Sequence, residues 1–316
     1  MKKGFTLFLL LTVCYLPLLG QQTDSLTIQT NSLFNQLDSI FTAGDSLSIF
    51  KLIDSLIVSA GSGSQSQLAI RAGYNSNIAS SGRTLGITKF GISPGISYYH
   101  KSGLYADASL YWSKEYDPDF YLSVFSAGYL MPVTKRWSLV AEYNRYLYLQ
   151  SASGDSIPYK NNLGISNFLE FKPVTFRLDY YLYFGEKTGH RIMPGVFVSV
   201  EKKNWRGIKR IVLYPSFNVM FGSEQITEQV PNARTAVGVL LLLKKGLPLF
   251  TEKRKTVFGV MNYAFSLPLS VTWKNWNFLV NYTYTIPVAL KGEDLGSLTQ
   301  SGYASASVTR YINFKK

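Results

Sequence analysis

The sequence predicts an all-β fold, a closed antiparallel transmembrane β-barrel of about twelve strands behind a short N-terminal helical leader. Apolar and polar residues alternate in segments of about ten residues, the length that a tilted strand needs to cross a bilayer. Hydrophobic residues make up 46% of the chain and charged residues only 16%, below the roughly 25% that is usual in soluble domains. The chain also begins with the pattern of an export signal.

That signal occupies residues 1–20. Lys2 and Lys3 form a short basic start, and an apolar stretch follows up to Gly20. This order of a charged region and an apolar region is typical of a secretory signal peptide, so we expect cleavage after Gly20. The sole cysteine, Cys14, would leave with the signal, and the mature chain would then contain no disulfide bond.

Residues 21–65 are predicted to form a periplasmic amphipathic helical leader and linker. Apolar residues recur there at helical spacing in two matching groups, at Leu33, Phe34, Leu37, Ile40 and Phe41 and at Ile49, Phe50, Ile53, Leu56 and Ile57. A Gly-Ser stretch at residues 61–64 forms a flexible hinge. Two interpretations stay open: the leader packs on itself or on a neighbour, or it folds into the barrel mouth as a plug.

The barrel itself is predicted over residues 66–316. Its twelve expected strands are residues 67–77, 88–99, 104–113, 120–132, 137–149, 161–171, 174–184, 191–201, 209–221, 257–273, 277–286 and 303–314. In the strand at 174–184, Phe176 and Leu178 lie on one face, and Arg177 and Asp179 lie on the other, because neighbours in a strand point to opposite faces. Tight turns alternate with longer polar connections, as in outer-membrane barrels.

Aromatic residues mark the expected membrane interfaces. An indole ring prefers the boundary between lipid and water, where its ring is dry and its N–H is wet. The tryptophans lie in or beside turns or near a strand end, and an aromatic residue closes the last strand. The predicted interface anchors are Trp112, Trp137, Trp205, Trp273, Trp276 and Phe314.

With these features the chain resembles the outer-membrane β-barrel proteins of Gram-negative bacteria over residues 66–316. Residues 98–107 look like a strand–turn–strand of that class, and Phe314 resembles its terminal aromatic residue. The resemblance implies a location in the outer membrane with both mature termini in the periplasm. It also implies two partners, the outer-membrane lipids and the barrel assembly machinery.

The formal net charge of +13 has two interpretations. Basic residues in the short turns would lie near anionic lipid headgroups, or basic residues inside the barrel would attract anions. The charged residues on the polar faces carry both signs, which equally suits ion pairs in a partly filled lumen. These lumen candidates are Arg71, Lys89, Asp107, Glu142, Glu170, Arg177, Asp179, Glu201 and Arg210. We expect no nucleic-acid partner for an exported barrel.

The first functional hypothesis is passive passage of small hydrophilic solutes through the lumen. The alternative is a non-conducting structural anchor, adhesin or envelope-complex partner that acts through a long external loop, residues 222–256, or through the leader. That loop contains the apolar run 236–243, which we expect to fold inward, to lie along the membrane rim or to bind a partner. An additional strand is disfavoured because it would make the strand count odd.

Enzymatic activity is not expected. The chain has only two histidines, His100 and His190, and the topology places them at opposite ends of the barrel. A catalytic triad needs a base, a nucleophile and an orienting group that converge. With these histidines apart and no cysteine in the mature chain, we also expect no metal and no cofactor.

Overall fold

The computed structural model describes residues 66–76, 91–114, 119–134, 136–148, 159–233, 235–292 and 300–314. The predicted signal peptide at 1–20, the predicted leader at 21–65 and the lumen candidate Lys89 lie outside these ranges. Within them, strands dominate and a single α-helix, α4 (Ala236–Lys244), occurs. The strands are β1 (Gln67–Asn75), β2 (Gly91–Tyr99), β3 (Leu104–Trp112), β4 (Phe120–Pro132), β5 (Trp137–Tyr148), β6 (Tyr159–Phe171), β7 (Val174–Gly185), β8 (Thr188–Val198), β9 (Val200–Trp205), β10 (Ile208–Leu213), β11 (Ser216–Pro231), β12 (Phe250–Ser266), β13 (Leu269–Trp273), β14 (Trp276–Pro287) and β15 (Ser301–Asn313).

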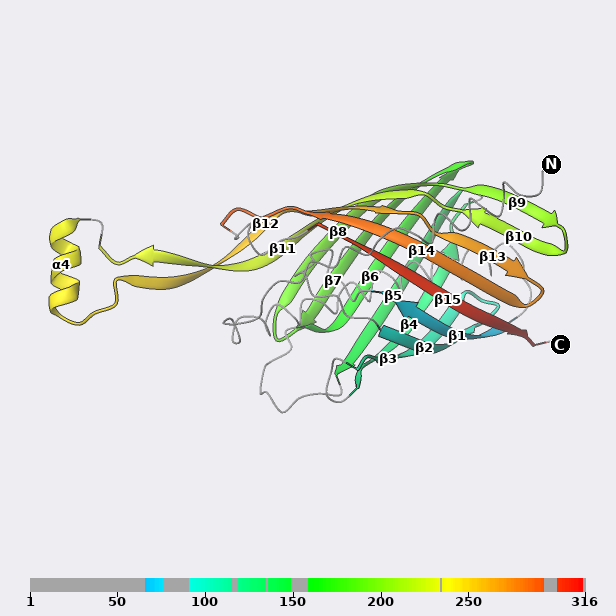
Figure 1. The fold of residues 1–316 in the computed structure, drawn as a ribbon, viewed down its shortest axis with the longest axis horizontal. Coiled ribbons are helices and arrows are strands. Elements are labelled where there is room, and N and C mark those ends of the chain that lie inside the picture. The colour runs from blue at the N-terminus through cyan, green and yellow to red at the C-terminus, as the bar shows by residue number, and fades with distance from the viewer. Residues whose placement is uncertain are drawn as a thin grey trace, which may run out of the picture. The chain divides into compact units, whose positions relative to one another are not determined.

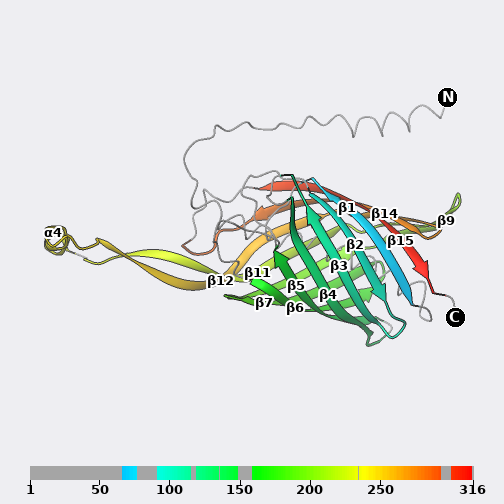
Figure 2. The same cartoon turned by 90° about the horizontal axis from the view of Figure 1, so that it is seen from below.

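The strands close into a barrel (Figure 1, Figure 2). Each strand from β1 to β8 pairs antiparallel with the next, and β1 also pairs with β15. The ring continues from β15 through β14 to β12, then through β11 back to β8. Because β9, β10 and β13 prolong β8, β11 and β12 at one end, the described part of the chain forms a 12-strand barrel. The predicted closed antiparallel β-barrel is confirmed.

The outer surface of the barrel is apolar. Along β1, Arg71 and Asn75 are buried while Ile70 and Tyr74 are exposed, so neighbouring residues point to opposite faces. Exposed apolar side chains are also cross-strand neighbours, as in the pairs Ile70 with Ile96, Ile165 with Tyr180 and Phe278 with Val308. A soluble monomer rarely exposes so continuous an apolar surface, whereas a barrel in a bilayer requires one.

The connections differ between the two ends of the barrel. Short turns join β2 to β3, β4 to β5, β6 to β7, β9 to β10 and β13 to β14, and they lie at the end that holds the start of β1 and the end of β15. Gly103 in the first of these turns has a φ of 95°, and a Cβ there would lie 2.3 Å from the Leu130 carbonyl oxygen. Only glycine fits this turn, because it has no Cβ and adopts a positive φ without steric strain.

At the opposite end of the barrel, the prediction of a long loop over residues 222–256 is wrong. β11 pairs with β8 only as far as Gly222, and β12 pairs with β14 only from Asn262 onward. Beyond these points β11 and β12 pair with each other, out to Pro231 and Phe250. The result is a long two-stranded ribbon that carries α4 at its tip (Figure 1, Figure 2). We call residues 223–258 the ribbon.

The predicted apolar run 236–243 forms the body of α4, not an additional strand. Thr235 caps its N-terminus by accepting a hydrogen bond from the Gly238 N–H. At the other end Gly246 has a φ of 64°, and the Leu247 N–H donates to the Leu242 carbonyl over 3.0 Å. This arrangement is the Schellman C-cap, which glycine favours. Across the described ranges no helix is long and apolar enough to cross a membrane.

Candidate functional site

The candidate site is the barrel lumen, whose wall is lined by inward-facing side chains. On β14 and β15 most of these side chains are uncharged and polar, and the buried apolar or aromatic ones are Leu279, Tyr303 and Tyr311. The buried polar members are Asn277, Asn281, Thr283, Thr285, Ser305, Ser307 and Thr309. Several are hydrogen-bonded to each other or to the neighbouring strands, for example Asn281 to Thr283 over 2.9 Å and Thr283 to Ser266 over 2.9 Å. One side of the lumen therefore offers hydroxyl and amide groups without charge.

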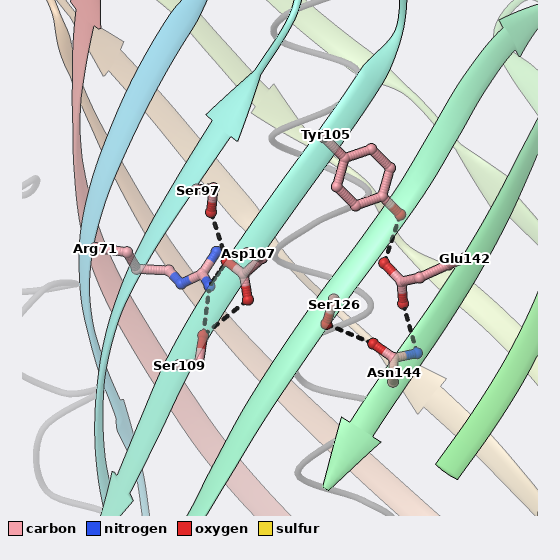
Figure 3. Close-up of polar contacts among 8 residues, drawn as sticks. All are labelled: Arg71, Ser97, Tyr105, Asp107, Ser109, Ser126, Glu142 and Asn144. Atoms are coloured by element: carbon pink, nitrogen blue, oxygen red, sulfur yellow. Dashed lines mark hydrogen bonds and ion pairs between the residues drawn. The ribbon is translucent and has the colours of Figure 1, made fainter.

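On the β1–β3 side, a buried ion pair joins Arg71 and Asp107 (Figure 3). Their charged groups approach to 3.0 Å, and the side chains are 2% and 1% exposed. Ser97 and Ser109 each donate a hydrogen bond to the carboxylate of Asp107. Gly95 on β2 lies between the partners, and a Cβ at this position would lie 3.0 Å from Arg71 Nη2. The absence of a side chain at Gly95 allows the guanidinium of β1 to reach across β2 to β3.

A second network follows on β3–β5 (Figure 3). The Tyr105 hydroxyl donates to Glu142 Oε2 over 2.5 Å, and Asn144 Nδ2 donates to Glu142 Oε1 over 2.8 Å. Ser126 in turn donates to Asn144. Tyr105 crosses β4 above Gly128, where a Cβ would lie 2.5 Å from the phenol ring. As at Gly95, an inward-facing glycine gives room for a long polar side chain to cross a strand.

A second charged pair lies within β7. Arg177 Nε is 2.6 Å from Asp179 Oδ2, and the two side chains are 10% and 1% exposed. The guanidinium carbon of Arg177 also lies 5.6 Å from the centre of the Phe168 ring, a cation–π arrangement. Burial removes water from both charges, so each depends on the other for stabilisation.

The remaining lumen candidates lie closer to the end of the barrel with the short turns. Arg210 and Glu201 pair over 2.5 Å, with side chains 19% and 25% exposed. Glu170 lies 3.7 Å from Lys172 of the β6–β7 turn and is partly exposed. The structure therefore pairs six candidates with each other, whereas Glu142 and Glu170 find partners outside the predicted set. Tyr105, Gly95 and Gly128 were not predicted. Gly95 offers a local signal, because it lies between the inward-facing Ser93 and Ser97.

An apolar cluster lies on the lumen wall. It consists of Phe168, Phe197, Val212, Tyr214 and Leu279, all buried. Phe168 comes from β6, Phe197 from β8 and Leu279 from β14, so the cluster follows the wall across this part of the ring. We call this cluster the constriction.

The predicted interface anchors lie at the barrel ends. Trp137, Trp205 and Trp273 are exposed, and Trp273 is the cross-strand partner of Trp276. Basic side chains lie over three of these rings, with Lys202 5.1 Å from Trp205, Lys274 4.9 Å from Trp273 and Arg310 5.4 Å from Trp276. Trp112 is half-buried at the opposite end of β3, and Phe314 contacts Tyr98 beside the C-terminus. Amphipathic aromatics next to cations suit a lipid headgroup layer.

The two histidines have local partners. His100 Nδ1 lies 2.8 Å from the Ser102 hydroxyl in the exposed β2–β3 turn. His190 Nδ1 lies 2.9 Å from the Tyr180 hydroxyl. In the parts of the chain that are described, no group of three His, Cys, Asp or Glu residues is placed to hold a metal ion.

The strand pairing closes an antiparallel β-barrel whose exterior is apolar, as a lipid bilayer requires. No protein-family model and no curated protein matches the chain. Among solved structures, the KdgM porin aligns with a TM-score of 0.42 at 10% identity, over 77% of this chain and 98% of its own. The NanC porin gives a TM-score of 0.40 at 10% identity, over 77% and 98% of the two chains.

The OprD structure from Pseudomonas aeruginosa gives a TM-score of 0.31 at 8% identity, over 80% of this chain and 96% of its own. Likenesses of this size identify no relative and carry no functional information. The barrel follows from the strand pairing of the chain itself.

Proposed function

We propose that the barrel spans the outer membrane with both termini on the periplasmic side. The short turns lie at the end of the barrel where β1 starts and β15 ends. Outer-membrane barrels place short turns in the periplasm and longer segments outside. The ribbon and α4 then face the cell exterior, and Trp205, Trp273 and Trp276 lie near the inner leaflet.

We further propose that the lumen is a narrow path for passive passage of small hydrophilic solutes. The observation that carries this proposal is the uncharged polar lining that β14 and β15 contribute, with Asn277, Asn281, Thr283, Ser305 and Thr309 facing inward. Hydroxyl and amide groups on a lumen wall can exchange hydrogen bonds with hydrophilic solutes.

The pairing of charges supports weak ion selectivity. Arg71 pairs with Asp107, Arg177 with Asp179, and Arg210 with Glu201. A selectivity ring needs a net charge of one sign, whereas each of these pairs is neutral as a unit. The arrangement therefore favours ion pairs over an anion-attracting lumen as the interpretation of the polar faces.

Reconstitution of the purified, folded chain in a planar lipid bilayer tests this function. We expect discrete conductance steps and, in a salt gradient, a reversal potential close to zero. The folded state is verified beforehand by the change in electrophoretic mobility on heating. If folded protein inserts into the bilayer and gives no conductance, the channel proposal is wrong.

The constriction gives a sharper prediction. Leu279→Ala together with Phe168→Ala should raise the single-channel conductance, because both inward-facing side chains belong to the apolar cluster on the lumen wall. The matched control is Phe278→Ala, which changes the exposed, outward-facing neighbour of Leu279 on β14. The control should leave the conductance unchanged. Equal conductance in the wild type and the double variant would show that ions do not pass the constriction.

A second candidate role is contact with a partner outside the cell. The ribbon favours it, because its paired strands extend about nine residues, from Ser223 at the barrel wall to Pro231, or about 30 Å at 3.3 Å per residue. A solute path does not require such an extension. This role is compatible with a conducting or a closed lumen.

A further inference from the structure

Helix α4 presents a wide apolar face to solvent. Val237 and Leu240 are 68% and 65% exposed, and none of the 9 helix residues is buried. At 100° per residue, the exposed residues Val237, Leu240, Leu241 and Leu243 lie within an arc of about 160°. The half-buried side, with Val239 and Leu242, is apolar as well. Leu247 and Phe250 add exposed apolar surface just after the helix. A helix that is apolar all round is normally buried in a protein core or in a membrane.

The structure holds this apolar tip in a defined conformation. Both helix ends are capped, by Thr235 and by Gly246. Asn232 ties together the two chain segments below the helix: its amide donates to the Pro248 carbonyl over 2.8 Å and accepts from the Thr251 hydroxyl over 2.5 Å. The tip is therefore a folded unit that keeps its apolar side chains outward.

The charge around the tip has one sign. Lys244 and Lys245 end the helix, and both are exposed. Between Thr235 and Phe250 the sequence contains no aspartate and no glutamate. A partner that covers this tip must therefore supply apolar surface along the exposed face of the helix and negative charge at its base.

We propose that α4 inserts into an anionic lipid bilayer that faces the outer end of the barrel. Every residue from Ala236 to Leu243 is apolar or glycine, so an inserted helix would bring no polar side chain into hydrocarbon. The helix is about 14 Å long at 1.5 Å per residue, which is close to one leaflet of a hydrocarbon core of about 30 Å. Lys244 and Lys245 would then meet the phosphate groups of the lipids.

The length of the ribbon indicates that this bilayer is not the one that the barrel spans. The belt of exposed apolar residues on the barrel marks the membrane that the barrel spans. The ribbon carries α4 about 30 Å beyond the rim, estimated at 3.3 Å per residue from Ser223 to Pro231. Figure 1 and Figure 2 both show the ribbon leaving the end of the barrel with α4 at its far tip. The inference does not depend on whether the lumen conducts.

The test uses the full chain in lipid nanodiscs, mixed with separate vesicles that contain phosphatidylglycerol. We expect the discs to float with the vesicles in a density gradient, and to float less with vesicles of phosphatidylcholine alone. Leu240→Asp with Leu241→Asp should weaken this capture about tenfold or more, because two leucine side chains lose their transfer into hydrocarbon. Both leucines are exposed, so barrel folding should not change, which the heat-induced mobility shift verifies.

The matched control is Lys187→Asp in the short β7–β8 connection, on the same side of the barrel and exposed. It changes the net charge as much as the double leucine variant does, but away from the tip. The control should retain capture. Loss of capture in both variants, or retention in both, would overturn the proposal, since the effect would then follow from charge or from another surface.

A tryptophan placed in the tip identifies the bilayer. In Leu241→Trp, brominated lipids in the vesicles should quench the additional fluorescence, whereas brominated lipids in the nanodisc should not. Quenching from the disc lipids alone would show that α4 lies in the membrane of its own barrel, and it would overturn the proposal. Quenching from neither source, together with binding of the tip to an added surface protein, would assign the tip to a protein partner and would also overturn it.

Discussion

Asp179→Asn is expected to move the reversal potential of the reconstituted barrel in the direction of anion preference. It is also expected to lower the free energy of unfolding by about 3 kcal/mol, the cost of removing one partner from a buried ion pair. Asp179 is the carboxylate beside Arg177, at 2.6 Å, and it is 1% exposed. Without it, the guanidinium contributes an uncompensated positive charge to the lumen wall. Reversal potentials in a salt gradient and denaturant unfolding in lipid vesicles measure the two effects.

Two controls separate charge from packing. Arg177→Gln combined with Asp179→Asn removes both charges, so the reversal potential should return close to the wild-type value. Glu201→Gln breaks the Arg210 pair, whose side chains are 19% and 25% exposed. It should cost less than about 1 kcal/mol, because solvent screens a partly exposed pair. An unchanged reversal potential in Asp179→Asn would show that permeating ions do not approach Arg177.

The barrel strands were predictable because hydrocarbon imposes a strict rule on them. Every outward residue must be apolar, so the alternation in the strand at 174–184 is visible without any knowledge of its neighbours. The same rule fails beyond the membrane. The ribbon strands leave the bilayer, and alternation then carries no information about pairing. The segment from Gly222 to Thr256 was therefore predicted as a loop, although β11 and β12 pair along about half of it.

The apolar run 236–243 was ambiguous for a different reason. A short continuous apolar run fits a buried strand and a helix equally well by periodicity. The deciding signals lie at its ends. Thr235 is a favourable N-cap, and Gly246 followed by Pro248 is typical of a helix that stops. These local signals predict α4, whereas its exposure at the tip of the ribbon depends on tertiary structure.

The lumen residues were also predictable only in part. Alternation places Arg71, Asp107, Arg177 and Asp179 on polar faces, but it does not give their partners. Pairing between Arg71 and Asp107 requires the register of three strands and the space above Gly95. Strand register is a non-local property, so a single sequence does not reveal which inward-facing charges meet. Lys89, also predicted for the lumen, lies outside the described residues.

Val280→Arg is expected to destabilise the barrel in lipid vesicles by about 2–4 kcal/mol, the cost of an arginine on the lipid face near the bilayer midplane. Val280 lies in the middle of β14, points outward and is 56% exposed. In water, an arginine at so exposed a position would cost little. A large loss of stability therefore requires hydrocarbon around this residue. Denaturant titration of the folded band on unheated gels measures the loss.

The matched control is Val237→Arg in α4. Val237 is 68% exposed, so the same exchange occurs at a site that is at least as open but lies beyond the barrel. Its effect on barrel unfolding should be within about 0.5 kcal/mol, as for a surface substitution. If Val280→Arg costs no more than Val237→Arg, lipid does not surround the barrel. The proposed membrane orientation and solute path would then fail together, because both require the apolar exterior to face a bilayer.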